Sequence, residues 1–400
     1  DRPMEVNLRE ITRVKRDWPH HALFVSLMVE SKQDAWHDAV KRAEDAGADG
    51  LELNFGCPHG MSERGMGAAV GQVPDYACMI VTWVKEVART PVMVKLTPNV
   101  TDVRVIGRAA KKGGADALSL INTINSIMGV NLDTLAPRPQ VRGQGSHGGY
   151  CGPAVKPIAL NMVSQIASDP DIRLPISGIG GVQAWQDAAE FLLLGAQSVQ
   201  VCTAVMHYGY RIVQPLIDGL KGWMRQKGYQ CIADFQGKSV ERIHDWGDLD
   251  LNYKVVAEID PAKCINCGLC YIACEDGCHQ SIKKTAVPEA EFRARVARGE
   301  AAVPATPKSG QNGHGFTFAD RTFVSGAKPY THGAGDGYVN TYEIKQDTCV
   351  GCNMCSLVCP VENCITMKEV DTGKPPMSWR QYQELLAAGK IQPIEPPKHV

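Results

Sequence analysis

Short apolar runs alternate with amphipathic stretches over about the first 230 residues of the chain. This alternation is typical of βα units that build a parallel sheet with helices on its surface. A helix is predicted over Asp34–Ala46, because its apolar residues recur every three or four positions and Gly47 suits the position after a helix end. Its apolar face is formed by Trp36, Ala39, Val40 and Ala43. The predicted strands are His21–Val29, Gly50–Phe55, Val92–Leu96, Ala117–Asn122, Pro175–Ile179 and Ser198–Ala204.

The strand count favours an α/β fold in which this chain holds six of the eight strands of a (β/α)8 TIM barrel. Six units in about 220 residues average roughly 35 residues each, so about 70 residues with two more strands are expected before Asp1. The alternative is an open doubly wound sheet, but such sheets usually carry a glycine-rich loop after the first strand, and none follows Val29. Glycine-bearing or polar turns instead follow the last two strands, where barrels commonly hold a phosphate, at Gly180–Gly181 and Cys202–Thr203.

The charge balance names no partner. The chain has 42 basic and 43 acidic side chains, a formal net charge of −1. That balance argues against a protein held to nucleic acid or to a membrane surface by bulk electrostatics. No apolar run approaches the ~18 residues that span a bilayer, so we expect neither a nucleic-acid nor a membrane partner.

Eight of the 15 cysteines fall into two ordered runs near the C-terminus, which indicates metal binding in a reducing, cytoplasmic compartment. The runs are Cys264-x2-Cys267-x2-Cys270-x3-Cys274 and Cys349-x2-Cys352-x2-Cys355-x3-Cys359, the second followed by Pro360. In this spacing three thiolates surround one 4Fe–4S cluster and the fourth reaches a second cluster, as in two-cluster ferredoxins. The predicted ligand sets are Cys264, Cys267, Cys270 and Cys359 for one cluster, and Cys349, Cys352, Cys355 and Cys274 for the other.

Zinc is the alternative metal, but two CxxCxxCxxxC repeats exceed what a four-ligand zinc site needs. Glu275 stands where the second run has Pro360, a difference that removes no ligand. Cys278 and Cys364 lie outside the runs and are expected to be small buried hydrophobes.

These features divide the chain into a barrel over 1–230, a linker over 231–254, a ferredoxin-like α+β domain over 255–375 and a C-terminal tail over 376–400. The ferredoxin-like domain carries a glycine-rich insertion at about 279–340, longer than a compact ferredoxin needs. A short charged helix is predicted inside it over Pro288–Arg298.

The predicted strand ends carry distinctive polar and glycine-rich motifs. They are LELNFGCPHG at 51–60, ERGMG at 63–67, GQ at 71–72, VKLTPNVTD at 94–102, INTI at 121–124 and VKPIAL at 155–160. With the two cysteine runs, they resemble the dihydropyrimidine dehydrogenases over nearly the whole chain. The resemblance implies an iron–sulfur and FMN subunit that works with a partner subunit carrying FAD and binding NADH, as a heterotetramer.

The activity implied by this resemblance is reduction of the 5,6 double bond of uracil or thymine. Such a reaction needs a hydride at C6, which the flavin supplies, and a proton at C5. The proton donor must be neutral at pH 7, a condition that a thiol of pKa ~8.5 meets.

The resemblance assigns roles to individual residues. Cys57 matches the proton donor, and CPHG breaks a predicted strand at the end where barrel enzymes carry their catalytic groups. Asn54, Asn122 and Thr123 match substrate-binding positions, and an amide offers both a donor and an acceptor to a pyrimidine edge. Lys95 matches a lysine beside the flavin, where a cation stabilises the anionic reduced ring. The residues matching the FMN phosphate site are Gly152, Gly180, Gly181, Cys202 and Thr203.

Two further expectations concern the segment after the predicted second strand. Gly56 stands where the mammalian-type enzyme has Ser, so a contact from that hydroxyl is lost. Residues 59–71 contain glycines and methionines in a composition typical of a mobile lid.

Two other functions stay open. A dihydroorotate dehydrogenase shares the Asn-x-x-Cys-Pro and Val-Lys-Leu patterns, but the fused cysteine-rich domain and the PHG continuation disfavour it, and a cation directed at the substrate carboxylate would favour it. An electron-transfer subunit without pyrimidine chemistry would hold no stoichiometric FMN and would lose nothing on substitution of Cys57.

Overall fold

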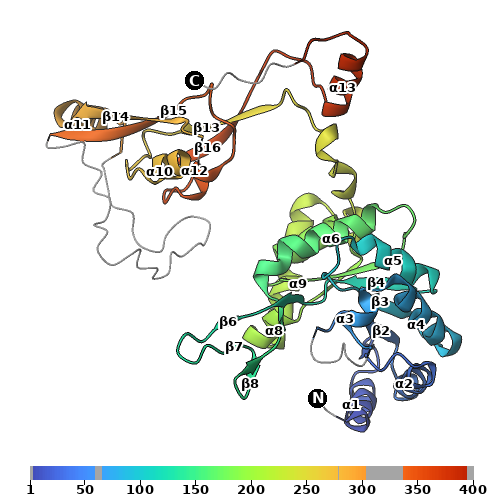
Figure 1. Ribbon diagram of the computed structural model, residues 1–400. Helices are drawn as coiled ribbons and strands as arrows, with labels where there is room; N and C mark the ends of the chain where they lie inside the picture. The colour runs from blue at the N-terminus through green and yellow to red at the C-terminus, as the bar shows by residue number, and fades with distance from the viewer. Residues whose placement is uncertain (1–2, 59–64, 278, 303–336, 394–400) are drawn as a thin grey trace. The chain divides into compact units, whose positions relative to one another are not determined.

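The computed structural model describes residues 3–58, 65–277, 279–302 and 337–393 (Figure 1). The chain forms two compact units, one ending at Ile243 and the other beginning at His244, within the predicted linker 231–254. Among the described residues, no helix combines the length and apolarity needed to cross a bilayer.

The first unit is built on a six-stranded parallel half-barrel sheet. Its strands are β1 (Phe24–Leu27), β2 (Gly50–Asn54), β3 (Val92–Lys95), β4 (Ala117–Leu120), β11 (Ile176–Ile179) and β12 (Ser198–Gln200). They are ordered β1-β2-β3-β4-β11-β12, so chain order and spatial order agree. All six predicted strands are confirmed as elements, and so is their parallel pairing.

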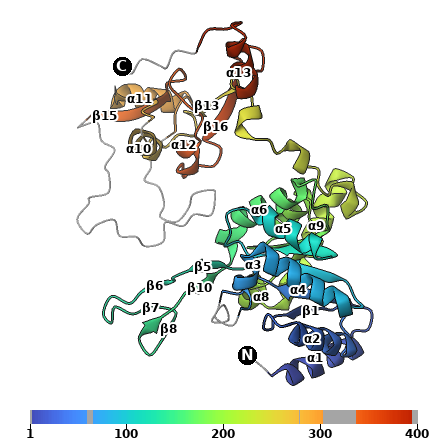
Figure 2. The same ribbon diagram turned by 45° about the vertical axis from the view of Figure 1, so that its right-hand side comes forward.

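Helices follow the strands and cover the sheet (Figure 2). They are α1 (Met4–Asp17), α2 (Gln33–Asp45), α3 (Ala68–Gly71), α4 (Pro74–Val87), α5 (Val103–Lys112), α6 (Lys156–Ser168), α7 (Trp185–Leu193), α8 (Thr203–Tyr208) and α9 (Val213–Lys227). The predicted apolar face of α2 is confirmed, because Trp36, Ala39, Val40 and Ala43 are all buried. Gly47 follows this helix with φ +109°, a conformation that glycine adopts readily.

Between β4 and α6 the chain leaves the sheet and forms a projecting arm of short antiparallel ladders (Figures 1 and 2). The paired strands are β5 (Ile124–Ser126) with β10 (Gly148–Tyr150), β6 (Gly129–Val130) with β7 (Pro137–Arg138), and β8 (Gln140–Val141) with β9 (Gln144–Gly145). The sequence did not predict this arm, because strands of two or three residues are too short to show an alternation of apolar and polar positions.

The second unit contains two antiparallel pairs, β13 (Lys254–Ile259) with β16 (Ile365–Val370) and β14 (Ile282–Pro288) with β15 (Tyr338–Ile344). Its helices are α10 (Leu269–Asp276), α11 (Glu289–Ala297), α12 (Met354–Leu357) and α13 (Trp379–Ala387). The predicted charged helix corresponds to α11. Most of the predicted insertion lies outside the described residues, and α13 lies within the segment predicted as a tail. Single 3-10 turns are η2 (Pro153–Val155), η3 (Tyr210–Ile212), η4 (Ile232–Asp234), η5 (Val240–Arg242) and η6 (Trp246–Asp248).

Candidate active site and cysteine quartets

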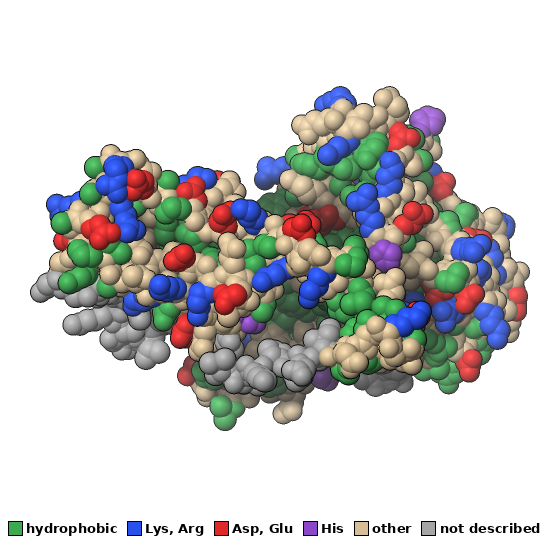
Figure 3. Space-filling model, turned by 90° about the horizontal axis from the view of Figure 1, so that it is seen from above, with side chains coloured by type: hydrophobic (Ala, Val, Ile, Leu, Met, Phe, Trp, Pro, Cys, Tyr) green, Lys and Arg blue, Asp and Glu red, His purple; other side chains and the backbone are tan. Residues whose placement is uncertain are grey.

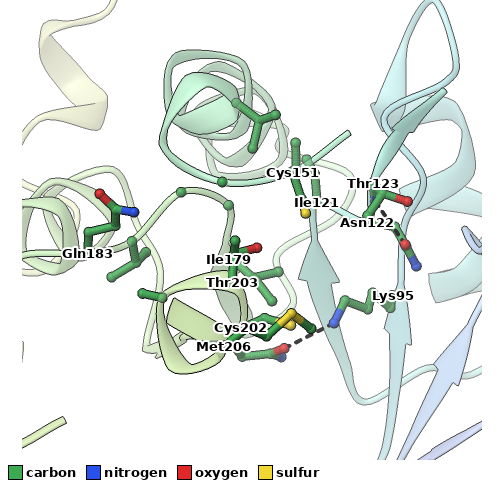
Figure 4. Close-up of a pocket in the computed structure, with 17 residues that line it drawn as sticks. Lys95, Ile121, Asn122, Thr123, Cys151, Ile179, Gln183, Cys202, Thr203 and Met206 are labelled. Atoms are coloured by element: carbon green, nitrogen blue, oxygen red, sulfur yellow. Dashed lines mark hydrogen bonds between the residues drawn. The ribbon is translucent and has the colours of Figure 1, made fainter. Parts of the chain in front are cut away.

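A cavity of about 190 Å³ opens at the carboxyl ends of β3, β4, β11 and β12 (Figure 4). In a parallel barrel, this is the end of the sheet at which catalytic side chains gather. The predicted site residues that line it are Lys95, Asn122, Thr123, Gly152, Gly180, Gly181, Cys202 and Thr203. Asn54 and Cys57 are the predicted residues outside this lining.

Asn54 reaches the cavity through Asn122. Its Oδ1 atom accepts hydrogen bonds from Asn122 Nδ2 at 2.8 Å and from the backbone N–H groups of Cys57 and Gly56 at 3.1 and 3.2 Å. Because these three donors occupy the oxygen, the Nδ2 group of Asn54 is the part of the amide that can donate to a ligand. The hydroxyl of Thr123 is buried and has no hydrogen-bond partner among the described residues, so it too suits a polar ligand.

Gly56 allows this close pairing. A Cβ atom at position 56 would lie 2.5 Å from Asn122 Cβ, so any side chain there would displace Asn122 from Asn54. The glycine therefore changes the shape of the polar end of the site besides removing the hydroxyl that the mammalian-type Ser would supply.

The thiol of Cys57 is half-buried. Its carbonyl accepts a hydrogen bond from Ala68 N at 3.1 Å, and Gly67, at φ +57°, packs so closely that a Cβ there would lie 2.6 Å from that carbonyl oxygen. At the C-terminal end of the expected lid over 59–71, Ala68–Gly71 form α3 and Val70 is buried. Residues 59–64 of that segment lie outside the described residues.

Glycines shape the opposite wall of the cavity. Gly180 has φ +142°, and a Cβ there would lie 2.6 Å from Ala159 Cβ. Gly181 has φ +73°, and a Cβ there would lie 2.8 Å from the carbonyl oxygen of Gly152, which itself has φ +95°. These two turns can therefore bring bare backbone to the cavity, which is the arrangement that suits a phosphate group.

Lys95 ends β3 and belongs to a polar group that sequence reasoning missed. Its Nζ atom donates to Gln200 Oε1 at 3.2 Å, a bond marked in Figure 4, and lies 3.3 Å from Glu52 Oε2. The signal for Glu52 was its place between two leucines in a predicted strand of a parallel sheet, where a buried carboxylate needs a partner.

The lining fits a flavin mononucleotide. Ile121, Val155 and Ile179 supply apolar walls for a flat ring, the glycine turns supply a phosphate cradle, and Lys95 and Thr123 supply polar groups.

In the second unit the structure brings the cysteines together in two quartets. Cys274, Cys349, Cys352 and Cys355 line one small cavity of about 20 Å³. Burial, with the negative charge of the three neighbouring thiolates, raises the pKa of Cys355 to about 11. Backbone N–H groups of Ser281 and Ala257 donate to Cys274 Sγ at 3.2 Å and to Cys349 Sγ at 3.5 Å.

The other quartet comprises Cys264, Cys267, Cys270 and Cys359. Burial raises the pKa of Cys270 far above its ordinary value, and the charges of the other three thiolates and of Cys355 add to the effect. Hydrogen bonds from Cys364 lower the pKa of Cys264 to about 7 and that of Cys359 to about 6. Cys364 is 2% exposed, as expected of a small buried hydrophobe, but its thiol also contacts two members of this quartet.

The two cysteine loops share a backbone pattern. Asn266 and Gly351, one residue before the second cysteine of each run, both have positive φ, and so do Gly268 and Asn353, one residue after it. Glycine and asparagine tolerate this conformation better than other residues, so each loop can wrap tightly around a ligand. Among the described residues, no three His, Cys, Asp or Glu side chains converge closely enough to hold a single metal ion. Cys278 lies outside the described residues.

The carboxyl ends of the parallel strands carry amides, a lysine, a thiol and the glycine turns at Gly152 and Gly180–Gly181. This arrangement defines a barrel-type oxidoreductase of the flavin-dependent class. The chain belongs to the dihydroorotate dehydrogenase family, whose model matches residues 4–224.

Curated relatives refine this assignment. The chain is 42% identical over 292 residues to the NAD-dependent dihydropyrimidine dehydrogenase subunit PreA of Escherichia coli strain K12, covering 72% of this chain and 71% of the relative. It is 43% identical over 262 residues to the chloroplastic dihydropyrimidine dehydrogenase (NADP(+)) of Arabidopsis thaliana, covering 64% and 62%. The catalytic subunit of dihydroorotate dehydrogenase B (NAD(+)) of Pyrococcus abyssi is 40% identical over 237 residues, covering 59% and 74%. The predicted likeness to dihydropyrimidine dehydrogenases, which are oxidoreductases, is confirmed.

Proposed function

We propose that the chain is the flavin-binding and iron–sulfur subunit of a dihydropyrimidine dehydrogenase. One observation carries the choice within the family. The 292 residues aligned with the bacterial dihydropyrimidine dehydrogenase subunit exceed the 243 residues of the first unit, so that likeness continues into the cysteine-rich unit. The 237 residues aligned with the dihydroorotate dehydrogenase subunit do not exceed the first unit.

In this proposal the chain's own residues bind and protonate uracil or thymine. The Nδ2 group of Asn54, the amide of Asn122 and the hydroxyl of Thr123 would hydrogen-bond the pyrimidine edge. Cys57 would deliver its thiol proton to C5, and the resulting thiolate would regain a proton from solvent before the next turnover. FMN, when bound, supplies the hydride for C6.

FMN would occupy the cavity at the strand ends. Gly152, the Gly180–Gly181 turn, Cys202 and Thr203 would hold its phosphate through backbone and hydroxyl groups, and Lys95 would lie beside its ring. Electrons from NADH would enter through a partner subunit that carries FAD and would pass singly through two 4Fe–4S clusters in a heterotetramer. The pairing of Cys274 with the second run and of Cys359 with the first supports the crossed ligand sets.

The first unit would be six-eighths of a (β/α)8 barrel. Within the described residues, β1 and β12 each pair with a single neighbouring strand. Phe24 at the β1 edge is 46% exposed and lines an interior cavity of about 620 Å³. Two further strands pairing along these edges would close the sheet and cover that surface.

Cofactor analysis of the full-length protein tests the proposal. The expected result is stoichiometric FMN with about eight iron atoms and matching acid-labile sulfide per chain. Zinc in place of iron, or a flavin-free protein that still binds the partner subunit, would refute it.

A dihydroorotate dehydrogenase activity is the second candidate, on the strength of the 40% identity to that family's catalytic subunit. Its substrate carries a carboxylate, which a cationic side chain would bind. Among the described residues that line the cavity, Lys95 is the cation, and Glu52 lies 3.3 Å from it and offsets its charge. The site therefore favours a neutral pyrimidine.

A further inference from the structure

A carboxylate lies inside the half-barrel directly behind Lys95. Glu52 is the middle residue of β2, between Leu51 and Leu53, and its side chain is 10% exposed. An ionised carboxylate at such a position is costly unless charged and polar partners surround it. A residue kept there at this cost needs an explanation beyond packing.

The partners of Glu52 form a closed ring. Its Oε1 atom accepts hydrogen bonds from Ser119 Oγ and from Gln200 Nε2, both at 2.8 Å, and its Oε2 atom lies 3.3 Å from Lys95 Nζ. Gln200 Oε1 accepts in turn from Lys95 Nζ at 3.2 Å. The amide of Gln200 thus bridges the two charges, donating to the anion and accepting from the cation.

This ring directs Lys95 toward the cavity. The ammonium group has three N–H donors, and Glu52 and Gln200 take two of them. Lys95 and Gln200 both line the cavity at the strand ends, whereas Glu52 lines only the interior cavity, which Gln200 also reaches. The third N–H of Lys95 is therefore the one that can meet a ring bound in the first cavity.

We propose that Glu52 is a positioning residue that holds Lys95 against the flavin ring and partly offsets its charge, so that the flavin stays a strong hydride donor. The inference rests on the proposed function. Two-electron reduction to the anionic flavin places a new negative charge beside Lys95, which stabilises it. The carboxylate behind Lys95 weakens that stabilisation, lowers the reduction potential of the flavin and favours hydride transfer to the pyrimidine.

The flavin reduction potential of the Glu52→Gln variant of the full-length holoenzyme tests this role. Gln keeps the shape of the side chain and an oxygen acceptor for Ser119 and Gln200, but removes the charge. The expected result is at least a tenfold rise in the ratio of reduced to oxidised flavin at a fixed potential, a positive shift of ~30 mV for a two-electron couple. Hydride transfer to uracil, followed by flavin absorbance in a single turnover, should slow.

Two comparisons separate this role from a structural one. Glu44→Gln removes another buried carboxylate, at the C-terminal end of α2, which is 2% exposed and is held by Arg89 and Thr90. This variant should leave the flavin potential unchanged. In a Lys95→Met background the shift caused by Glu52→Gln should vanish, because in this proposal the carboxylate acts on the flavin through Lys95.

The outcomes distinguish the role of Glu52 from the proposed function. Two results would overturn the role of Glu52 and leave the proposed function standing. One is a Glu52→Gln variant that binds flavin normally at an unchanged potential, and the other is a shift that persists in the Lys95→Met background. If Glu52→Gln fails to fold, Glu52→Asp keeps the charge but draws it back from Lys95, and a positive shift of smaller size is expected; an unchanged potential would overturn the inference. Absence of stoichiometric flavin from the unaltered protein would instead overturn the proposed function itself.

Discussion

Cys57 is held at the end of β2 by backbone contacts that leave its side chain half-buried. Its N–H donates to Asn54 Oδ1 and its carbonyl accepts from Ala68 N, so the loop that carries the thiol is fixed on both sides of the residue. A fixed loop limits where the thiol can lie, which a general acid requires in order to reach the atom that it protonates.

Replacing Cys57 with Ala should reduce pyrimidine turnover by roughly 10²–10⁴-fold, the usual range for loss of a positioned acid. FMN binding should persist, because the cavity wall does not include this side chain. Ser should restore little activity, since its hydroxyl is a much weaker acid. The measurement is uracil reduction normalised to bound FMN in the complete enzyme.

The matched control is Cys78→Ala, which removes another half-buried thiol, in α4. It should keep near-normal turnover. Near-normal turnover of Cys57→Ala would move the acid to another group, with His59 as the next candidate.

For single residues, the sequence predicted eight of the residues that line the cavity but not the partners of Lys95. Lys95, Asn122 and the glycine turns follow strands that are visible in the hydrophobic pattern, so their convergence could be foreseen from the topology alone. The contact between Glu52 and Gln200 joins residues 148 positions apart, and neither a spacing nor a motif marks such a pair. The approach of Asn122 to Gly56 is likewise a matter of packing, visible only once a Cβ is placed on the folded backbone.

At the scale of the elements, an ion pair links α6 to α7 beside the Gly180–Gly181 turn. Asp187, 14% exposed, accepts hydrogen bonds from Lys156 Nζ at 2.6 Å and from the backbone N–H groups of Gln183 and Ala184, both at 2.8 Å. Burial opposes ionisation, but these hydrogen bonds hold the pKa of Asp187 below its ordinary value.

Asp187→Asn should therefore lower the free energy of unfolding of the first unit by about 2 kcal/mol at pH 7, the scale of a lost hydrogen bond to a charged group. Because the folded pKa is depressed, the stabilisation is present above the unfolded value of ~3.9 and is lost as pH falls through the lower folded value. Denaturant unfolding at pH 7 and at a series of values below 5 should show the difference between the variant and the unaltered protein shrinking in acid.

Asp218→Asn provides the control for this measurement. Asp218 is exposed on α9 and accepts a single hydrogen bond from Gln214, at 2.9 Å, so its substitution should change stability by less than about 0.5 kcal/mol. A pH-independent loss of stability in Asp187→Asn would contradict the role of its charge.

A second prediction at the scale of the elements concerns the two cysteine loops. Replacing the exposed ligand Cys352 with Ser should halve the iron content and loosen the second unit, because each cluster joins the two runs. The first unit has its own core and should unfold as before. Iron analysis and thermal unfolding measure these effects, with the exposed Cys231→Ser outside both runs as control.

Retention of about eight iron atoms in Cys352→Ser would contradict the ligand assignment.

Elements that pack against the core were predictable and the exposed arm was not. The strands of the sheet lie in apolar runs, and α2 repeats apolar positions every three or four residues, because both bury those side chains. The arm between β4 and α6 has exposed strands of two or three residues, with Leu132 and Val141 85% and 77% exposed, so no buried face imposed a pattern on its sequence.

At the scale of the whole molecule, the face shown in Figure 3 has no large surface region of one charge sign. On the face shown in Figure 3, Lys and Arg side chains are mixed with Asp and Glu side chains, in keeping with the net charge of −1. A G-x-G-x-x-G spacing occurs at Gly143–Gly148, but it lies in the antiparallel arm and not between a parallel strand and a helix. It therefore does not have the context of a dinucleotide site.

Anaerobic mixing of the full-length protein with NADH alone should leave the clusters oxidised, because the G-x-G-x-x-G spacing at Gly143–Gly148 does not lie between a parallel strand and a helix, as a dinucleotide site does. Addition of the FAD-carrying partner subunit should bleach the cluster absorbance within the turnover time. Rapid bleaching by NADH without the partner would contradict the proposed electron route.

The choice between a neutral pyrimidine and a carboxylated one tests the proposed function most directly. The measurement is turnover of uracil and of orotate by the full-length chain assembled with its electron-input partner and supplied with NADH, with product identified as the dihydropyrimidine. The expected result is formation of dihydrouracil, with orotate reduced far more slowly, because Glu52 offsets the charge of Lys95 beside the site. Reduction of orotate with no conversion of uracil would contradict the assignment and place the chain with the dihydroorotate dehydrogenases in activity as well as in family.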